Sequence, residues 1–363
     1  MVKLVGMVAG IKINDEMWCI SRILNGLYKM NIAIGKVNYV CDLPEKNEPD
    51  RQAYTDILSY NGKLYFIPAF AKNIAVYDVK LSTFSEINIS NYFKKSAGEF
   101  NIGGGCIYGE WLYLYPCLSN LLIRINVQNG EVEINDSFIK NNNLKKDIFA
   151  YHKRHCQIGN KLYIALASYD GVLCIDMENY EYKTYSIPNN GSGYAAIIDV
   201  KDELWLAPHG DGAVVRYNMK SKLIEKLGEY PCGFNRSRGL AFSAFINCSN
   251  ENLYLLPFAA NMIIKVDIEK RIMQQLNIEL SEPWLYDAMR DITSINIQSA
   301  TKFDDKYYLF SESLNRMFIV SCTGEINEVE FCLEEYKSRK TDAIYIKECR
   351  GFALSDFLSY IYP

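Results

Sequence analysis

Short apolar runs alternate with polar turn pairs along most of the chain, and this pattern repeats. In the stretch NGKLYFIPAFAKNIAVYDVK, an aromatic residue follows Leu64, and Asp78 closes a second apolar run fourteen residues after that leucine. With Leu64 as position zero, the same pattern occurs seven times, at spacings of 47, 48, 50, 42, 49 and 54 residues. Position zero is occupied by Met17, Leu64, Leu112, Leu162, Leu204, Leu253 and Tyr307.

Two further positions of the repeat keep one type of residue. The residue after position zero is aromatic in every copy: Trp18, Tyr65, Tyr113, Tyr163, Trp205, Tyr254 and Tyr308. The residue at position fourteen is short and polar in every copy: Asn31, Asp78, Asn126, Asp176, Asn218, Asp267 and Ser321. Because aromatic residues make up only 13% of the chain, seven of them in one register are not a coincidence.

Each copy carries the turn signals of four antiparallel strands. A turn pair such as Asn61-Gly62 precedes position zero and is typical of a hairpin. A second turn lies near position eight, at Asn25, Asn73, Asn120, Asp170, Asp211, Asn261 and Asn315. A third lies at position fourteen, where a short polar side chain can bind the backbone. The pattern predicts an all-β fold, a seven-bladed β-propeller of four-stranded antiparallel blades over residues 1–331.

The period and the order of strands resemble seven-bladed propellers of the kelch and galactose-oxidase central-domain type, over roughly residues 4–331. The double glycine of kelch repeats occurs only once, within Gly103-Gly104-Gly105, and the Trp-Asp dipeptide of another propeller repeat is missing. The resemblance therefore implies the fold and carries over no catalytic residue.

Residues 332–363 break the repeat. They contain a charged stretch, the strand-like segment AIYIKE and a helix-like close in which Ser355 is a candidate N-cap. We expect this C-terminal tail to clasp the ring shut across its first and last blades, or else to dock a partner.

The connections between blades are predicted to form the functional face. In a propeller they lie on the same face as the turn near position eight, whereas the two tight turns lie on the opposite face. All the variation in repeat spacing, from 42 to 54 residues, falls in these connections. Loops of irregular length on a rigid scaffold usually carry binding or catalysis.

These connections hold isolated arginines, aromatic residues and the three histidines His152, His155 and His209. Convergent guanidinium groups and rings suit a ligand with carboxylate or phosphate groups and a planar or sugar-like body. The alternative for any single arginine is that it is solvated or binds the carbonyl groups of neighbouring loops. The candidate ligand-binding residues are Arg51, Tyr54, Arg154, His155, His209, Arg236, Arg238, Tyr286 and Arg290.

Two classes of function follow. The first is a non-catalytic recognition module that binds a small anionic or carbohydrate-like ligand, or a protein partner, on the long-loop face. The alternative is a propeller enzyme, a lyase or hydrolase, with a histidine base and an arginine anion clamp at the channel mouth. The chain has only three histidines and no recognisable nucleophile arrangement. Both observations weigh against the enzyme, so no catalytic residue is assigned.

Composition narrows the range of partners. A net charge of −4 argues against nucleic acid as a partner, and no apolar run reaches 18 residues, so no membrane span is expected. His152 and His155 point to opposite faces if their segment is a strand, so we expect no metal site and no cofactor. Eleven scattered cysteines without a CxxC pair, and an N-terminus without a signal-peptide pattern, favour a cytoplasmic protein with reduced thiols. We expect a monomer.

Overall fold

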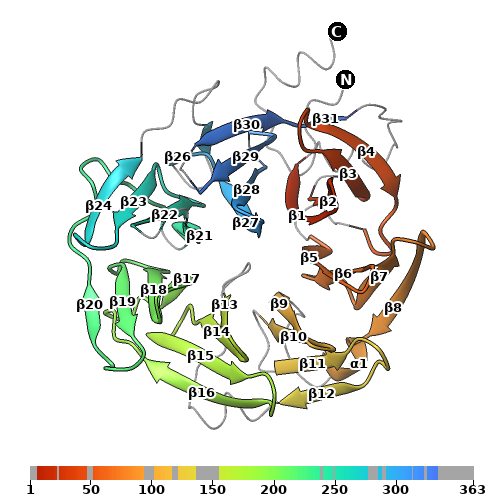
Figure 1. The fold of residues 1–363 in the computed structure, drawn as a ribbon, viewed down its shortest axis with the longest axis horizontal. Helices are drawn as coiled ribbons and strands as arrows, with labels where there is room; N and C mark the ends of the chain where they lie inside the picture. The colour runs from red at the N-terminus through yellow and green to blue at the C-terminus, as the bar shows by residue number, and fades with distance from the viewer. Residues whose placement is uncertain are drawn as a thin grey trace.

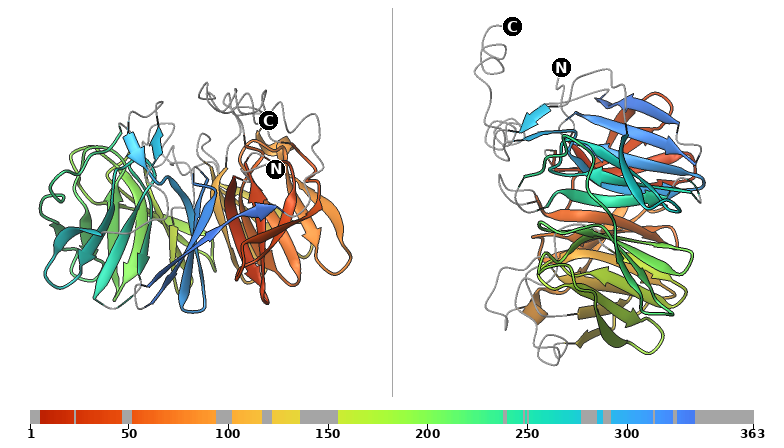
Figure 2. Two further views of the ribbon diagram at one scale, coloured as in Figure 1. Left: turned by 90° about the horizontal axis from the view of Figure 1, so that it is seen from above. Right: turned by 90° about the vertical axis from the view of Figure 1, so that its left-hand side faces the viewer.

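The structure is a computed structural model, and it describes residues 6–22, 24–46, 52–93, 102–116, 122–135, 155–237, 240–247, 249, 251–276, 285–287, 292–312, 314–322 and 325–333. Figure 1 shows a ring of seven sheets around a common axis, and Figure 2 shows the same ring from two sides. Each blade contains four strands that are consecutive in sequence and antiparallel, with the first strand innermost, and a short fifth strand joins the outer edge of the first blade. The predicted all-β seven-bladed propeller is therefore confirmed.

The strands of the first four blades lie close to the predicted apolar runs. Blade 1 contains β1 (Met7–Ile13), β2 (Glu16–Ser21), β3 (Leu27–Asn31) and β4 (Lys36–Cys41). Blade 2 contains β5 (Tyr54–Tyr60), β6 (Lys63–Pro68), β7 (Asn73–Asp78) and β8 (Thr83–Asn88). Blade 3 contains β9 (Ile102–Tyr108), β10 (Trp111–Pro116), β11 (Leu122–Asn126) and β12 (Val132–Asn135). Blade 4 contains β13 (His155–Ile158), β14 (Lys161–Ala165), β15 (Gly171–Asp176) and β16 (Glu181–Ser186).

The remaining three blades follow the same order. Blade 5 contains β17 (Tyr194–Val200), β18 (Glu203–Pro208), β19 (Val215–Asn218) and β20 (Ile224–Lys226). Blade 6 contains β21 (Phe242–Asn247), β22 (Asn252–Pro257), β23 (Ile263–Asp267) and β24 (Ile272–Leu276). Blade 7 contains β27 (Ile297–Phe303), β28 (Lys306–Ser311), β29 (Arg316–Ser321) and β30 (Ile326–Glu330).

Few elements lie outside the blades. The short helix α1 (Ser90–Phe93) follows blade 2, and a hairpin of β25 (Leu285–Asp287) and β26 (Ile292–Ser294) lies between blades 6 and 7. The repeat pattern did not predict this hairpin. The part of the chain that the structure describes contains no helix long and apolar enough to cross a membrane.

The position-fourteen residues form the turns that the sequence predicts. The Asp78 Oδ1 atom accepts hydrogen bonds from the backbone N–H groups of Lys80 and Leu81, at 3.0 and 2.9 Å. In all seven copies the side-chain oxygen at this position accepts at least one backbone N–H group two to four residues further on. A short polar side chain is what such a turn needs, so this position is structural.

Position zero and the aromatic residue after it build every interface between blades. Consecutive side chains of a strand point to opposite faces of its sheet, so these two residues contact different neighbours. Trp18 of blade 1 packs in one apolar cluster with Leu64 of blade 2, and its ring lies 5.8 Å from that of Tyr77. The same pairing recurs between the following blades as Tyr65 with Leu112, Tyr113 with Leu162, Tyr163 with Leu204, Trp205 with Leu253, Tyr254 with Tyr307, and Tyr308 with Met17. The last pair closes the ring.

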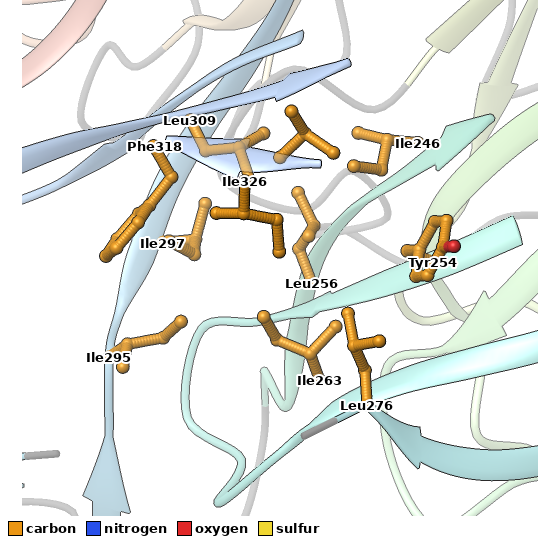
Figure 3. A pocket seen from close by; sticks show the side chains of 11 residues that line it. Ile246, Tyr254, Leu256, Ile263, Leu276, Ile295, Ile297, Leu309, Phe318 and Ile326 are labelled. Atoms are coloured by element: carbon orange, nitrogen blue, oxygen red, sulfur yellow. The ribbon is translucent and has the colours of Figure 1, made fainter. Parts of the chain in front are cut away.

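The interface between blades 6 and 7 contains an apolar cavity. Tyr254 is only partly buried, whereas the aromatic residue is buried in the other six copies. An apolar cavity with a water-accessible volume of about 20 Å³ remains here, and Figure 3 shows aliphatic side chains from both blades around it. Its lining consists of Ile246, Tyr254, Leu256, Ile263, Leu276, Ile295, Ile297, Leu309, Phe318, Val320 and Ile326.

The chain crosses from the last blade to the first at the outer edge of the ring. Strand β31 (Cys332–Leu333) pairs in parallel with β4, so it extends the sheet of blade 1 to five strands. The side chain of Phe331, which is 3% exposed, stacks on Phe310 within the cluster between blades 7 and 1. Residues 334–363 lie outside the described residues, so the role of the tail as a clasp or a docking element stays a prediction.

We expect truncation of an interface aromatic residue to destabilise the whole ring. Trp205 is fully buried, and Trp205→Ala is expected to lower the free energy of unfolding by about 3–5 kcal/mol. Leu223→Ala, at a position that is 56% exposed, is expected to change it by no more than about 0.5 kcal/mol. Urea unfolding followed by tryptophan fluorescence measures both. Equal effects of the two substitutions would contradict the interface role.

We also expect the crossing to the first blade to depend on Gly35. Gly35 and Gly62 both have positive φ angles, +67° and +74°, but a Cβ atom at Gly35 would overlap the Glu330 carbonyl oxygen, whereas Gly62 has no atom within 4 Å. Gly62→Ala therefore reports backbone strain alone, about 1–2 kcal/mol. Gly35→Ala is expected to lower the melting temperature further and to increase hydrogen exchange at Cys332 and Leu333. An equal drop in melting temperature for the two variants would show that the close approach of Gly35 to Glu330 adds nothing to stability.

Candidate functional site

The inner strands begin on the long-loop face, and six of them carry a β-bulge at that end. In each of these strands one extra residue is inserted within the first three residues, so it has no partner opposite it in the neighbouring strand. A bulge re-aims side chains and is common next to functional sites. The extra residues are Val8, Thr55, Gly103, Ala195, Ser243 and Gln298. The corresponding residue of blade 4 lies outside the described residues.

Four of the bulge residues line one pocket. Its walls come from β1, β5, β21 and β27, the inner strands of blades 1, 2, 6 and 7. Because blades 7 and 1 separate blade 6 from blade 2, a pocket that touches all four lies on the inner side of this arc, at the mouth of the central channel. The water-accessible volume is about 30 Å³. The lining residues are Val8, Gln52, Thr55, Asp56, Ser243, Ala244, Gln298, Ser299 and Ala300.

Six of the nine residues that line the pocket are polar, and two of them are almost fully buried. Ser243 is 3% exposed, and no protein group lies within hydrogen-bonding distance of its Oγ atom. Gln298 is 5% exposed, and its Nε2 atom donates to Asn296 Oδ1 at 2.9 Å and to Glu312 Oε2 at 3.3 Å. The Ser299 hydroxyl donates to the Val8 carbonyl oxygen at 2.6 Å. A buried hydroxyl group without a partner is costly, so a further polar group that bonded to Ser243 would be stabilised here.

Asp56 is the one ionisable residue among the described residues that line the pocket. It is 7% exposed, and its Oδ1 atom accepts the Ile57 N–H group at 2.9 Å. Elsewhere, no group of three or more His, Cys, Asp or Glu side chains within the described part of the chain is arranged to hold a metal ion, and the eight described cysteines form no disulfide.

Among the predicted site residues, Tyr54 lies in the core. It is 1% exposed and packs edge-on against Phe66, with 5.8 Å between ring centroids, in the cluster between blades 1 and 2. Burial, followed by the negative charge of Glu45, raises the pKa of its hydroxyl group. The neighbouring residues Thr55 and Asp56, rather than Tyr54, line the pocket.

His155 lies at the start of β13 and contacts the preceding blade. Its Nδ1 atom forms a hydrogen bond of 2.8 Å with the Tyr115 hydroxyl group, and the two rings meet edge to face. A Cβ atom at Gly104 would overlap that hydroxyl group, so a glycine of the triple-glycine segment gives Tyr115 room to reach His155. This contact joins blades 3 and 4 at the long-loop face.

His209 follows β18, and its backbone is held by the connection between blades 4 and 5. The His209 N–H group donates to the Gly193 carbonyl oxygen at 3.1 Å. That connection is fixed by Asp170, whose carboxylate accepts the backbone N–H groups of Asn189, Gly191 and Gly193 at 2.7, 2.8 and 2.9 Å. The position-eight residue of blade 4 therefore orders the loop that supports His209.

Arg236 pins the connection between blades 5 and 6. Its guanidinium group forms an ion pair of 3.2 Å with Asp211 and lies over the rings of Tyr230 and Phe234, at 5.3 and 5.8 Å from their centroids. Those two rings stack on each other and on Phe242. These contacts agree with the alternative considered for single arginines, in which the side chain holds neighbouring loops together.

The other predicted site residues lie outside the described residues or, for Tyr286, have only their backbone described, as part of β25. These are Arg51, Arg154, Arg238, Tyr286 and Arg290, and their convergence stays a prediction. None of the four predicted residues with described side chains lines the channel pocket. Sequence reasoning missed the bulge residues. They lie nine residues before position zero, or ten in blade 6, and three of them, Thr55, Ser243 and Gln298, are polar.

No family model matches the chain, and no curated protein matches it significantly. Among solved structures, virginiamycin B lyase from Staphylococcus aureus is similar with 17% identity and a TM-score of 0.61, over 86% of this chain and 94% of that chain. A catalytically inactive form of that lyase with quinupristin gives 16% identity and a TM-score of 0.63, over 90% and 96%. PorZ, a surface component of the type-IX secretion system of Porphyromonas gingivalis, gives 11% identity and a TM-score of 0.56, over 92% and 39%.

At these identities the likeness concerns the fold alone, and the similar structures include both a lyase and a surface component. The comparisons give no support to the kelch type in particular. By its own strands and by these comparisons, the chain is a seven-bladed β-propeller.

Proposed function

We propose that this protein is a recognition module that binds a small polar ligand at the mouth of its central channel, on the long-loop face. The observation that carries the proposal is the polar pocket between four inner strands, in which the Ser243 hydroxyl group has no protein partner. Leaving such a group buried and unbonded costs about 1–3 kcal/mol. A ligand group that bonds to it recovers this free energy only when the ligand is bound, which favours binding.

The scaffold supports binding because the lining residues are held in place before a ligand arrives. They belong to inner strands whose blades are packed against each other on both sides, and Gln298 and Ser299 are further fixed by hydrogen bonds. A preorganised site loses little conformational entropy on binding. A narrow pocket of this kind suits a small molecule better than the flat surface of a protein partner.

The pocket accommodates only the end of a ligand. Its water-accessible volume is about 30 Å³, and a single water requires about 10–15 Å³, so about two water-sized groups fit. The rest of the ligand extends toward the long-loop face, where the predicted residues His155, His209 and Arg236 lie. Their contribution to binding is part of the proposal.

Differential scanning fluorimetry against a metabolite and glycan library tests the proposal. A ligand at 100 times its dissociation constant is expected to add about 2.7 kcal/mol to the free energy of unfolding. Ser243→Ala is expected to abolish or weaken that shift without destabilising the free protein, because its hydroxyl group has no partner to lose. Ser85→Ala, on an exposed position of β8, is the matched control and should leave the shift intact. Capture of a protein partner with no small-molecule shift would contradict the proposal.

A second candidate function, a lyase or hydrolase, is favoured by the bond between His155 Nδ1 and the Tyr115 hydroxyl group. Such a bond fixes the orientation of an imidazole ring, as a general base requires.

If the protein is such an enzyme, the wild-type protein should convert at least one ligand from the fluorimetry screen to product. His155→Gln should then abolish turnover and retain binding, and Tyr115→Phe should lower the turnover number and shift its pH profile. Mass spectrometry of the incubated ligands measures this. Unchanged ligands after prolonged incubation would leave the recognition module as the function.

A further inference from the structure

We infer that Arg236 binds an anionic group of the ligand, a carboxylate or phosphate, on the long-loop face, and that Asp211 occupies this place until the ligand arrives. The inference rests on the proposed function, because it assigns the part of the ligand that stays outside the channel pocket. Arg236 then has two roles. Its ring and backbone contacts hold the connection between blades 5 and 6, and its ion pair with Asp211 is exchanged for the ligand.

The first observation is that Arg236 is held in place before any ligand binds. Its backbone forms an isolated β-bridge with Ala260, and its backbone N–H group donates to Asn235 Oδ1 at 2.8 Å. Its guanidinium group lies over the rings of Tyr230 and Phe234, at 5.3 and 5.8 Å from their centroids. Stacking on rings uses the face of a guanidinium group, so the N–H groups at its edge are left for an acceptor.

The second observation is that these N–H groups are paired incompletely. The Nη2 atom lies 3.2 Å from Asp211 Oδ1, and Asp211 is the one acidic partner of Arg236 within the described part of the chain. The Nη1 atom is buried and has no hydrogen-bond acceptor among the described residues. The side chain of Arg236 is 16% exposed, whereas that of Asp211 is 99% exposed. An ion pair with a fully exposed carboxylate contributes little, so an anion that bonds to both nitrogen atoms can replace it.

Binding to both nitrogen atoms requires a local rearrangement. Because the Nη1 atom is buried, the anion reaches it only after Asp211 has left and the guanidinium group has turned toward solvent. The Asp211 carboxylate loses little by this exchange, since water already surrounds it.

The Tyr230 hydroxyl group does not supply a second counter-charge. It donates to the Gly212 carbonyl oxygen at 3.2 Å. Burial raises the pKa of this hydroxyl group to about 12, although the positive charge of Arg236 acts in the opposite direction. The group is therefore protonated and uncharged at neutral pH, and the charge of Arg236 remains available for the ligand.

The third observation is that the rings beneath Arg236 are continuous with a wall of the channel pocket. Phe234 lies nearly parallel to both Tyr230 and Phe242, with angles of 15° and 8° between the ring planes. Phe242 is fully buried and is followed directly by Ser243, which lines the pocket. One stack of rings therefore supports both the arginine and the pocket wall, as a preorganised site requires.

Benzoate, benzamide and phenyl phosphate test the assignment, because they share one ring and differ in the charge of the attached group. The full chain is titrated with each probe at constant ionic strength, which keeps the screening of charges equal. NMR follows the Nε–H signal of Arg236 and the backbone amide signals of Asp211 and Gly212. We expect saturable shifts with at least one of the two anions, and binding of benzamide that is weaker by about tenfold or more. The tighter anion identifies the bound group as a carboxylate or a phosphate.

Two variants locate the site and identify the exchanged ion pair. Asp211→Asn is expected to tighten the binding of that anion about twofold to fivefold, because the competing carboxylate is removed. Arg236→Gln is expected to weaken it by about tenfold or more. Asp202→Asn is the matched control, since Asp202 also forms a surface ion pair, at 2.8 Å from Lys220, and should leave the affinity unchanged. Loss of the fold cannot raise an affinity, so Asp211→Asn decides the matter even where Arg236→Gln is unstable.

Three results would each overturn the inference and leave Arg236 as a loop contact alone: benzamide that binds as tightly as both anions, an affinity that Asp211→Asn does not raise, or no saturable shift with either anion. The proposed function is decided separately, by the fluorimetry screen and the Ser243→Ala variant, so the two failures are distinguishable.

Discussion

The alternation of side chains along the second strand of each blade is the constraint on which the rest of the structure depends. One residue faces the preceding blade and the next, an aromatic residue, faces the following blade, so every blade has two apolar faces. A single blade cannot bury both, and a row of blades would leave one exposed at each end. Only a closed ring buries both apolar faces of all seven blades, and the packing of Tyr308 with Met17 completes this ring.

The two faces of the ring then take different roles. On one face, hairpin turns closed by short polar side chains repeat with little variation. On the other face, the inner strands begin with bulges, and the connections are tied down individually by Asp170 and Arg236. The rigid interfaces between blades allow this second face to vary. A pocket with a costly buried hydroxyl group is tolerated there because the surrounding blades supply the stability.

The channel pocket also depends on ring closure. It spans blades 6, 7, 1 and 2, and therefore includes the junction between the end and the beginning of the propeller. Around that junction lie the Phe331 side chain, the parallel pairing of β31 with β4, and the hydrogen bond from Ser299 to Val8. The interface between blades 6 and 7, which contains the apolar cavity, borders the same arc. Residues that close the ring thus position the walls of the candidate site.

The sequence by itself determined the number of blades, the order of their strands, the Asx turns and the face that carries the variable loops, because all of these follow from local patterns repeated seven times. Only the tertiary structure decided which side chains face the channel. The pairing of β5 with β6 places a bulge at Thr55. As a result, Tyr54 points into the core, whereas Thr55 and Asp56 line the pocket. The partner of His155 is likewise supplied by another blade. Pairing register and contacts between distant segments leave no local signal in the chain, so one sequence read alone does not reveal them.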